Sequence, residues 1–249
     1  MRIGLILRLA ALLLLVAFLI RPGLFEPVFA PLTRNGAPAI YNQGDLMMLT
    51  LQHLGIVLAA TSASIVVAVG LAVLVTRPSG AEFLPLSRSL VNIGQTFPPV
   101  AVLALAVPAV GFGAKPTLIA LFLYGLLPIF ENALTGLTTL PRPVMEAATG
   151  VGMTGRQRLL RVEMPLAAPV ILAGIRLSVT IGLATATIGS TVAAKTLGEV
   201  IIAGLISDNL AFVLQGGLVV AVLAVLIYDA LSAAEMLLSR RMGLSLTAR

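Results

Sequence analysis

Cysteine is absent from this sequence, and histidine occurs once, as His53. Without cysteine the chain forms no disulfide and offers no thiolate to a metal. One histidine provides no cluster for metal binding or for a proton relay. The sequence therefore predicts no metal site, and it leaves the redox compartment undetermined.

Charged residues are also scarce, because Asp, Glu, Lys and Arg together make up only 10% of the 249 residues. Hydrophobic residues make up 59%, whereas soluble domains contain roughly 45–50% apolar and about 25% charged residues. The apolar residues gather in stretches about as long as those that cross a bilayer. This composition excludes an ordinary soluble domain and predicts a protein with one membrane domain.

The phosphate-binding pattern G-x-x-x-x-G-K-[ST] is a third absence. We therefore do not expect the chain itself to hydrolyse ATP or to bind a cofactor. No internal repeat, low-complexity segment or appended soluble domain stands out.

Six apolar stretches predict an all-α, polytopic membrane protein with about six transmembrane helices. They are Leu5–Ile20, Leu54–Val75, Leu90–Val110, Thr117–Leu137, Pro169–Val192 and Phe212–Leu238.

The basic residues predict the orientation of these spans. With both termini in the cytoplasm, most of the 16 Lys and Arg residues lie in cytoplasmic segments, as the positive-inside rule requires. The net charge of +6 is therefore interpreted as a sign of topology and not of nucleic-acid binding. The cytoplasmic set is Arg2, Arg8, Arg77, Arg88, Arg142, Arg156, Arg158, Arg161, Arg240, Arg241 and Arg249; the external set is Arg21, Arg34, Lys115 and Lys195.

The first stretch has an alternative interpretation as a signal peptide. Arg2 and Arg8 precede a Leu-rich run, and Val28-Phe29-Ala30 has the small-residue character of a cleavage site. Cleavage would leave five spans, with the termini on opposite sides of the membrane. We favour retention, so that residues 1–45 form the first span and an external connection, and residues 46–249 form the core.

The cytoplasmic loop at residues 138–168 predicts a first short helix. Pro143 suits the first turn of a helix, and Glu146 lies close enough to that end to favour the helix dipole. Gly150 and Gly152 are expected to end the helix, because glycine adopts the left-handed conformation at little cost.

A second helix follows in the same loop. Thr154 and Gln157 have the spacing of a capping box, so this helix is expected to start there and to run to Pro165. The two helices form an elbow at the membrane surface.

The residues of this elbow resemble the EAA loop of ABC importer permeases. That pattern reads EAA, three residues, Gly, nine residues, Ile, one residue, Leu-Pro, and here Val162 replaces Ile and Met164 replaces Leu. The two small alanines would let one helix face sit deep in a groove. The resemblance implies that the elbow docks into a cleft on an ATPase and converts nucleotide-driven closure into movement of the spans. The alternative is an ordinary loop whose arginines face lipid phosphate. The matching positions are Glu146, Ala147, Ala148, Gly152, Met164 and Pro165.

Longer segments resemble the permeases of osmoprotectant importers, which carry glycine betaine, choline, carnitine and related amines. The likeness extends over roughly Leu46–Leu238, and Thr76–Phe83 and Gln95–Pro99 are most similar to the low-affinity betaine branch. Ala193–Gly198 departs from the Gly-rich turn of many members. The resemblance implies a type I ABC importer (MetI-like) permease fold. The matching segments are Gly94–Ala104, Gly111–Gly113, Ala120–Pro128, Met164–Arg176 and Ile181–Thr187.

Two prolines inside the third span suggest a substrate path. Pro98 and Pro99 lack amide hydrogens, so the carbonyls of Gly94 and Gln95 lose their helical donors and the helix is expected to kink. Those carbonyls and the ring of Phe97 would suit a trimethylammonium group. The alternative is a packing kink satisfied by neighbouring helices. The candidate path residues are Gly94, Gln95, Thr96, Phe97, Pro98 and Pro99.

The fifth span carries small residues at four-residue spacing along one helix face, which favours a contact in the core or with another subunit over lipid exposure. Arg176, Glu131 and Asp229 are the ionisable residues deepest within spans. Unpaired charge is costly there, so we expect Arg176 to pair with Glu131 or Asp229, and we favour this over a proton relay. The small residues are Gly174, Ser178, Gly182, Ala186 and Ser190.

These patterns predict a permease subunit in a bacterial inner membrane, with both termini cytoplasmic. The expected partners are an ABC ATPase dimer, a second and different permease chain, and an external substrate-binding protein. Permeases for methionine, phosphonate or sulfonate are the nearest alternative. An ion-coupled secondary transporter or a channel would leave the elbow without a purpose.

Overall fold

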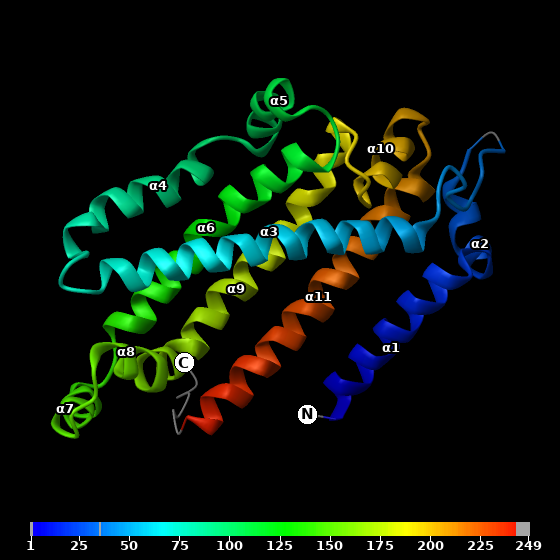
Figure 1. Cartoon of the computed structure of the whole chain (residues 1–249). Helices are drawn as coiled ribbons and strands as arrows, with labels where there is room; N and C mark the ends of the chain where they lie inside the picture. The colour runs from blue at the N-terminus through cyan, green and yellow to red at the C-terminus, as the bar shows by residue number, and fades with distance from the viewer. Residues whose placement is uncertain (1, 35, 243–249) are drawn as a thin grey trace. The chain divides into compact units, whose positions relative to one another are not determined.

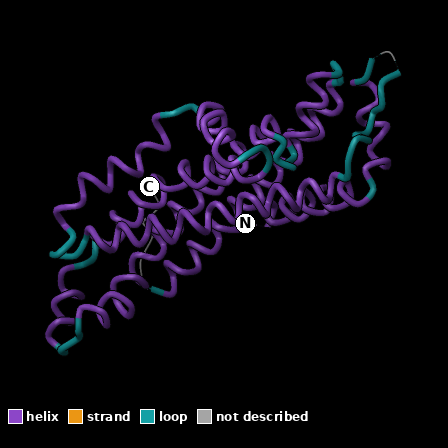
Figure 2. Tube along the Cα trace, turned by 45° about the horizontal axis from the view of Figure 1, so that its top comes forward, coloured by secondary structure: helices purple, strands orange, loops and turns teal. Residues whose placement is uncertain are grey.

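The computed structural model describes residues 2–34 and 36–242, and within those residues all regular elements are helical (Figure 2). Arg249, assigned above to the cytoplasmic side, lies outside the described residues. The α-helices are α1 (Arg2–Ile20), α2 (Glu26–Phe29), α3 (Leu46–Val75), α4 (Leu84–Thr96), α5 (Pro99–Val110), α6 (Ala114–Thr138), α7 (Arg142–Gly150), α8 (Gly155–Arg158), α9 (Met164–Ala186), α10 (Gly198–Ile206) and α11 (Leu210–Arg241). Short 3-10 helices cover Pro22–Phe25, Ala30–Leu32, Ala81–Phe83 and Thr187–Val192, and a π-helical turn covers Leu159–Glu163.

Four helical stretches in the described residues are long and apolar enough to cross a membrane: α3, α6, the run Gly155–Val192, and α11. Two bent pairs raise the number to six if each pair is one span. These pairs are Ile6–Ile20 with Pro22–Leu32, and Ala81–Thr96 with Pro99–Val110. The protein is therefore a multi-pass membrane protein, but the predicted third span, Leu90–Val110, is not one helix.

Two of the other predicted boundaries also differ from the structure. α3 begins at Leu46 instead of Leu54, because the carboxylate of Asp45 accepts a hydrogen bond of 2.6 Å from the amide of Met48 and caps the helix there. α9 begins at Met164 instead of Pro169, because the helix enters this span directly from the elbow.

The contacts divide the chain into two units that interleave along the sequence. The first comprises Met1–Ala59, Pro98–Leu121 and Gly182–Ile227, and the second comprises Ala60–Phe97, Phe122–Ile181 and Tyr228–Arg249. The boundary expected at residue 45 stays a prediction.

The first unit has a core rich in aromatic side chains. The ring of Tyr41 meets that of Phe212 edge-on, with centroids 5.3 Å apart. The side-chain amide of Gln215, which is fully buried, accepts from the amide of Tyr41 at 3.0 Å and donates to the carbonyl of Ala39 at 2.7 Å. These bonds attach the irregular segment before α3 to α11. The tyrosine hydroxyl donates to the carboxylate of Glu199. Burial, and to a smaller extent this carboxylate, raises the pKa of Tyr41 to about 12.

The second unit is built around α6, with α3, α4 and α9 packed against it (Figure 1). Ile129, Phe130 and Ala133 of α6 are fully buried. A side chain at Gly94 of α4 would come within 2.3 Å of the Leu123 carbonyl oxygen, so this glycine permits the close approach of α4 to α6. The elbow helices α7 and α8 lie between α6 and α9 in the chain and belong to this unit.

Candidate functional site

The elbow begins with α7, which ends in a left-handed turn at Gly152. The Gly152 amide donates to the carbonyl of Thr149 at 2.9 Å, and the Met153 amide donates to that of Ala148 at 3.1 Å. This pair of bonds is the Schellman motif, and Gly152 has a φ of +78°. The predicted reversal at Gly152 is confirmed. The prediction that Gly150 is also left-handed is wrong, since it is the last helical residue of α7 and the motif needs only one such residue.

α8 begins with the predicted capping box. The hydroxyl of Thr154 accepts from the amide of Gln157 at 3.3 Å, and the side chain of Gln157 accepts from the amide of Thr154 at 2.9 Å. Both bonds satisfy amides that the first turn of a helix leaves without partners. The predicted start of the second helix is confirmed.

The prediction that this helix ends at Pro165 is wrong. α8 passes through the π-helical turn Leu159–Glu163 into α9, and the amide of Met164 donates to the carbonyl of Leu159. The π-helical turn interrupts the regular α-helical hydrogen-bond ladder immediately before the proline. The missing amide of Pro165 therefore does not break the helix.

The EAA-like residues face different environments. Glu146 and Ala147 are exposed, and Met145, Glu146, Thr149 and Gly150 line a surface hollow of about 480 Å³. Ala148 is buried, so it faces the interior of its own chain. Both alanines were expected to present a small helix face to a partner, but only Ala147 is exposed. Met164 and Pro165 are half-buried at the start of α9, and the apolar side chains of Val144, Val151 and Leu160 are exposed.

A buried carboxylate that was not among the predicted site residues anchors the elbow. Glu163 is only 2% exposed. One of its oxygens accepts from Nε of Arg158 at 2.9 Å, and the other accepts from the guanidinium of Arg77, next to the end of α3. Arg158 also donates to the hydroxyl of Thr149 at 3.3 Å. One signal was available in the sequence, because Arg158 precedes Glu163 by five positions, whereas the second partner, Arg77, is 86 positions away.

The third predicted span breaks completely at Phe97 instead of kinking. Phe97 has φ −100° and ψ 140°, and Pro98 has φ −59° and ψ 142°; α5 then starts at Pro99. The break is attached to α6 at Tyr124, whose hydroxyl donates to the Phe97 carbonyl and whose carbonyl accepts from the Gln95 side chain at 3.0 Å. One carbonyl at the break is thus already bonded within the chain. The ring of Phe97 is 47% exposed, and Thr96 bonds back to the carbonyl of Ile93.

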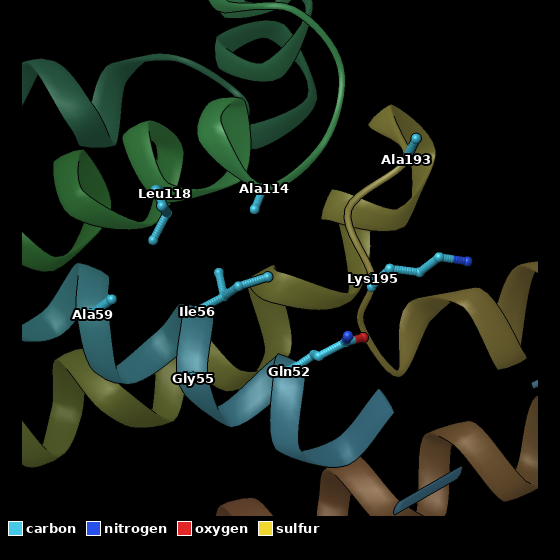
Figure 3. Close-up of a pocket in the computed structure, with 8 residues that line it drawn as sticks. All are labelled: Gln52, Gly55, Ile56, Ala59, Ala114, Leu118, Ala193 and Lys195. Carbon is cyan, nitrogen blue, oxygen red and sulfur yellow. The ribbon is translucent and has the colours of Figure 1, made fainter. Parts of the chain in front are cut away.

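The first unit contains a hollow of about 430 Å³ that none of the predicted path residues line. Its walls come from α3, the start of α6 and the segment after the 3-10 helix Thr187–Val192 (Figure 3). Ile56 and Leu118 point toward each other, whereas the ammonium of Lys195 points away from them and pairs with Glu199 at 3.0 Å. Ala193, at the rim, has a φ of +62°. The lining residues are Gln52, Gly55, Ile56, Ala59, Ala114, Leu118, Ala193 and Lys195.

Arg176 and Glu131 have charged partners that the sequence did not predict. Arg176 of α9 pairs with Glu235 of α11 at 3.0 Å, and its guanidinium lies 4.7 Å from the centre of the Tyr228 ring. Glu131 pairs instead with Arg88 of α4 at 3.1 Å. Asp229 also has an interaction, and its predicted contact with Arg176 stays a prediction. In the described residues no group of three or more His, Asp or Glu side chains is placed to hold a metal ion.

The small residues of the fifth span are placed at close contacts within each unit. A side chain at Gly174 would come within 2.6 Å of the Pro128 carbonyl oxygen, and Ser178 is buried where Gly125 approaches it. Gly182 lies beside Val57, and Ala186 is fully buried. Ser190 lies beyond the end of α9, in the 3-10 helix Thr187–Val192, so the single helical face expected for all five residues ends at Ala186.

Comparison with known proteins places this geometry in a family. Residues 64–243 match the family described as binding-protein-dependent transport system inner membrane component. The osmoprotectant import permease protein OsmY of Salmonella typhimurium is 39% identical over 191 residues, covering 77% of this chain and 80% of that protein. The choline transport system permease protein OpuBB of Bacillus subtilis is 38% identical over 195 residues, covering 78% and 88%.

A solved structure has the same fold. The inward-facing MetNI methionine ABC transporter matches with a TM-score of 0.69 and 20% sequence identity, covering 78% of this chain and 95% of that one. The predicted all-α, MetI-like permease fold is confirmed.

Proposed function

Because the chain belongs to the family of binding-protein-dependent transport system inner membrane components, we propose that it is the permease through which an ATP-driven importer moves osmoprotectants such as glycine betaine or choline. The names of its relatives support this class of substrate. The alternative is a permease for another small solute, such as methionine, a phosphonate or a sulfonate. An ion-coupled transporter would give the elbow no partner.

The observation that carries the proposal is the geometry of the elbow. The Schellman turn at Gly152 and the capping box at Thr154 fix two short helices at an angle, with Glu146 and Ala147 exposed. Exposed apolar side chains next to them, Val151 and Leu160, suit a docking surface for another protein. In our proposal this surface binds the ATPase, which hydrolyses ATP, while this chain is not an enzyme and binds no cofactor.

The proposed assembly contains an ATPase dimer, a second permease chain of different sequence and an external binding protein. It lies in the bacterial inner membrane, with both termini of this chain in the cytoplasm. The excess of arginine in the segments that contain the elbow supports this orientation.

Two features are proposed to line the substrate path. The ring of Phe97 and the carbonyls of Gly94 and Gln95 stay candidates, because Pro98 and Pro99 have no amides to offer those two carbonyls. The hollow beside Gly55 is the second candidate, since its largely apolar walls suit methylated ammonium groups.

The proposal is tested by reconstituting the chain in proteoliposomes with its ATPase, second permease and binding protein. We expect ATP-dependent uptake of radiolabelled glycine betaine or choline, with methionine as the control solute. Uptake of methionine without uptake of either amine would contradict the substrate class. The absence of any ATP-dependent uptake, with the complex assembled, would contradict the importer.

A further inference from the structure

Glu163 occupies the one position between Val162 and Met164 to which the EAA-like pattern gives no identity. It is the last residue of the π-helical turn and is almost fully buried. Removing a carboxylate from water is costly unless opposite charges and hydrogen bonds compensate it. Its presence at this point of the chain therefore requires the partners that surround it.

Those partners come from both sides of the carboxylate, one for each oxygen. Arg158 belongs to the elbow helix α8, and Arg77 lies two residues beyond the end of α3. The two arginine side chains are 30% and 25% exposed, so solvent screens these ion pairs less than it screens pairs on an open surface.

Each arginine is also bonded to the helix that precedes it in the chain or to residues at its end. Arg77 donates to the hydroxyl of Thr76 at 3.2 Å and to the carbonyl of Val73 at 3.3 Å, which fixes it to the last turn of α3. Arg158 donates to Thr149, whose hydroxyl donates in turn to the carbonyl of Met145 in α7. A continuous chain of polar contacts therefore runs from α3 through Glu163 to both helices of the elbow.

From this network we infer that Glu163 is a positioning residue for energy coupling, which makes the cytoplasmic end of α3 move together with the elbow. The inference rests on the proposed function, because it requires that an ATPase moves the elbow. α9 receives such a movement through the peptide chain, since the elbow runs into it without a break. α3 has no such covalent continuity with the elbow, and Glu163 provides the charged link.

The experiment measures ATP hydrolysed per substrate imported, in the reconstituted importer, for Glu163→Gln and Arg77→Gln. We expect each variant to hydrolyse ATP while importing less, so that this ratio rises at least about fivefold, within the range of coupling between linked sites. The double variant should be no worse than either single one, because both remove the same link. Arg77→Lys keeps the charge and should keep the ratio near that of the original protein.

Arg161→Gln is the matched control, because Arg161 lies in the same π-helical turn but is exposed. It removes one positive charge without removing the link, and its ratio should not change. The inference is overturned if Glu163→Gln lowers only the yield or thermal stability of the complex while the ratio stays constant, or if Arg161→Gln raises the ratio equally. Failure of the original protein to import any amine would instead contradict the proposed function.

Discussion

At Gly152 the backbone is left-handed, yet a side chain there would meet no atom within 4 Å. The cost of a substitution is therefore conformational and not steric. For residues with a β-carbon the left-handed region costs about 1–2 kcal/mol, and Asn tolerates it better than β-branched residues do. The same turn provides the sharpest single-residue test of the elbow.

We expect Gly152→Val to lose most uptake and most substrate-stimulated ATP hydrolysis while the protein still inserts into the membrane, because the elbow is distorted. Gly152→Asn should retain much of both. Gly150→Ala is the control, since Gly150 is helical and a side chain there meets open space. Uptake and ATPase assays on membrane vesicles check this, and normal activity in Gly152→Val would refute the coupling role.

Phe97 is exposed at the helix break, so its ring is available to a passing cation. Phe97→Ala should impair import of quaternary amines more than Phe97→Tyr, because only alanine removes the π face, which contributes about 0.5–2 kcal/mol. Michaelis constants for glycine betaine uptake measure the difference. Equal impairment in the two variants would leave packing as the role of the ring.

Single residues also show which features a sequence can reveal. The capping box joins Thr154 to Gln157, three positions apart, and the turn at Gly152 is equally local; both follow from residue type and spacing. Glu163 could not be interpreted in this way, because Arg77 lies 86 positions away and only the folded chain brings them together.

Between elements, Arg176 in α9 pairs with Glu235 in α11, a carboxylate that depth within the spans did not predict. The depth of the ionisable residues within the spans had favoured Asp229 or Glu131. The position of a side chain around each helix decides which carboxylate it meets, and Glu131 is turned toward Arg88 in α4. Contacts beyond the local sequence also change the effect of proline. The π-helical turn lets the helix continue from α8 past Pro165, and the chain breaks fully after α4, where the hydroxyl of Tyr124 donates to the Phe97 carbonyl.

Removal of the arginine alone should be more harmful than removal of both partners. Arg176→Gln leaves the carboxylate of Glu235 partly buried without its ion pair, which lowers thermal stability and uptake. Arg176→Gln with Glu235→Gln should recover part of that loss, as a double-mutant cycle of melting temperatures would measure.

Glu131, one of the two carboxylates expected from depth, supplies the control for this pair. Arg176→Gln combined with Glu131→Gln should recover nothing, because Glu131 is paired with Arg88. Recovery with Glu131→Gln but not with Glu235→Gln would show that the Arg176–Glu235 pair is not the functional one.

At the scale of the whole molecule, import requires free space along the membrane-crossing helices, and the family fold by itself does not locate it. The hollow of the first unit is open because small residues line it, including Gly55 and Ala59 of α3 and Ala114 of α6. The sequence does not reveal this hollow, because its walls come from three segments that lie far apart in the chain. Part of its lining comes from α3, and the other end of this helix is linked to the elbow through Glu163.

α3 contains a matched pair of glycines with which to test the hollow. Gly55 and Gly70 are both exposed, and a β-carbon at either meets no atom within 4 Å, so a substituted side chain starts in open space at both positions. Only Gly55 lines the hollow. Gly55→Leu should lower the maximal rate of glycine betaine uptake about tenfold or more, because a rate follows the free-energy barrier exponentially and a filled path raises it. Gly70→Leu adds the same side chain to the same helix and should leave uptake nearly unchanged. Equal uptake by the two variants, at equal amounts of assembled complex, would remove the hollow from the path and leave the break at Phe97 as the remaining candidate.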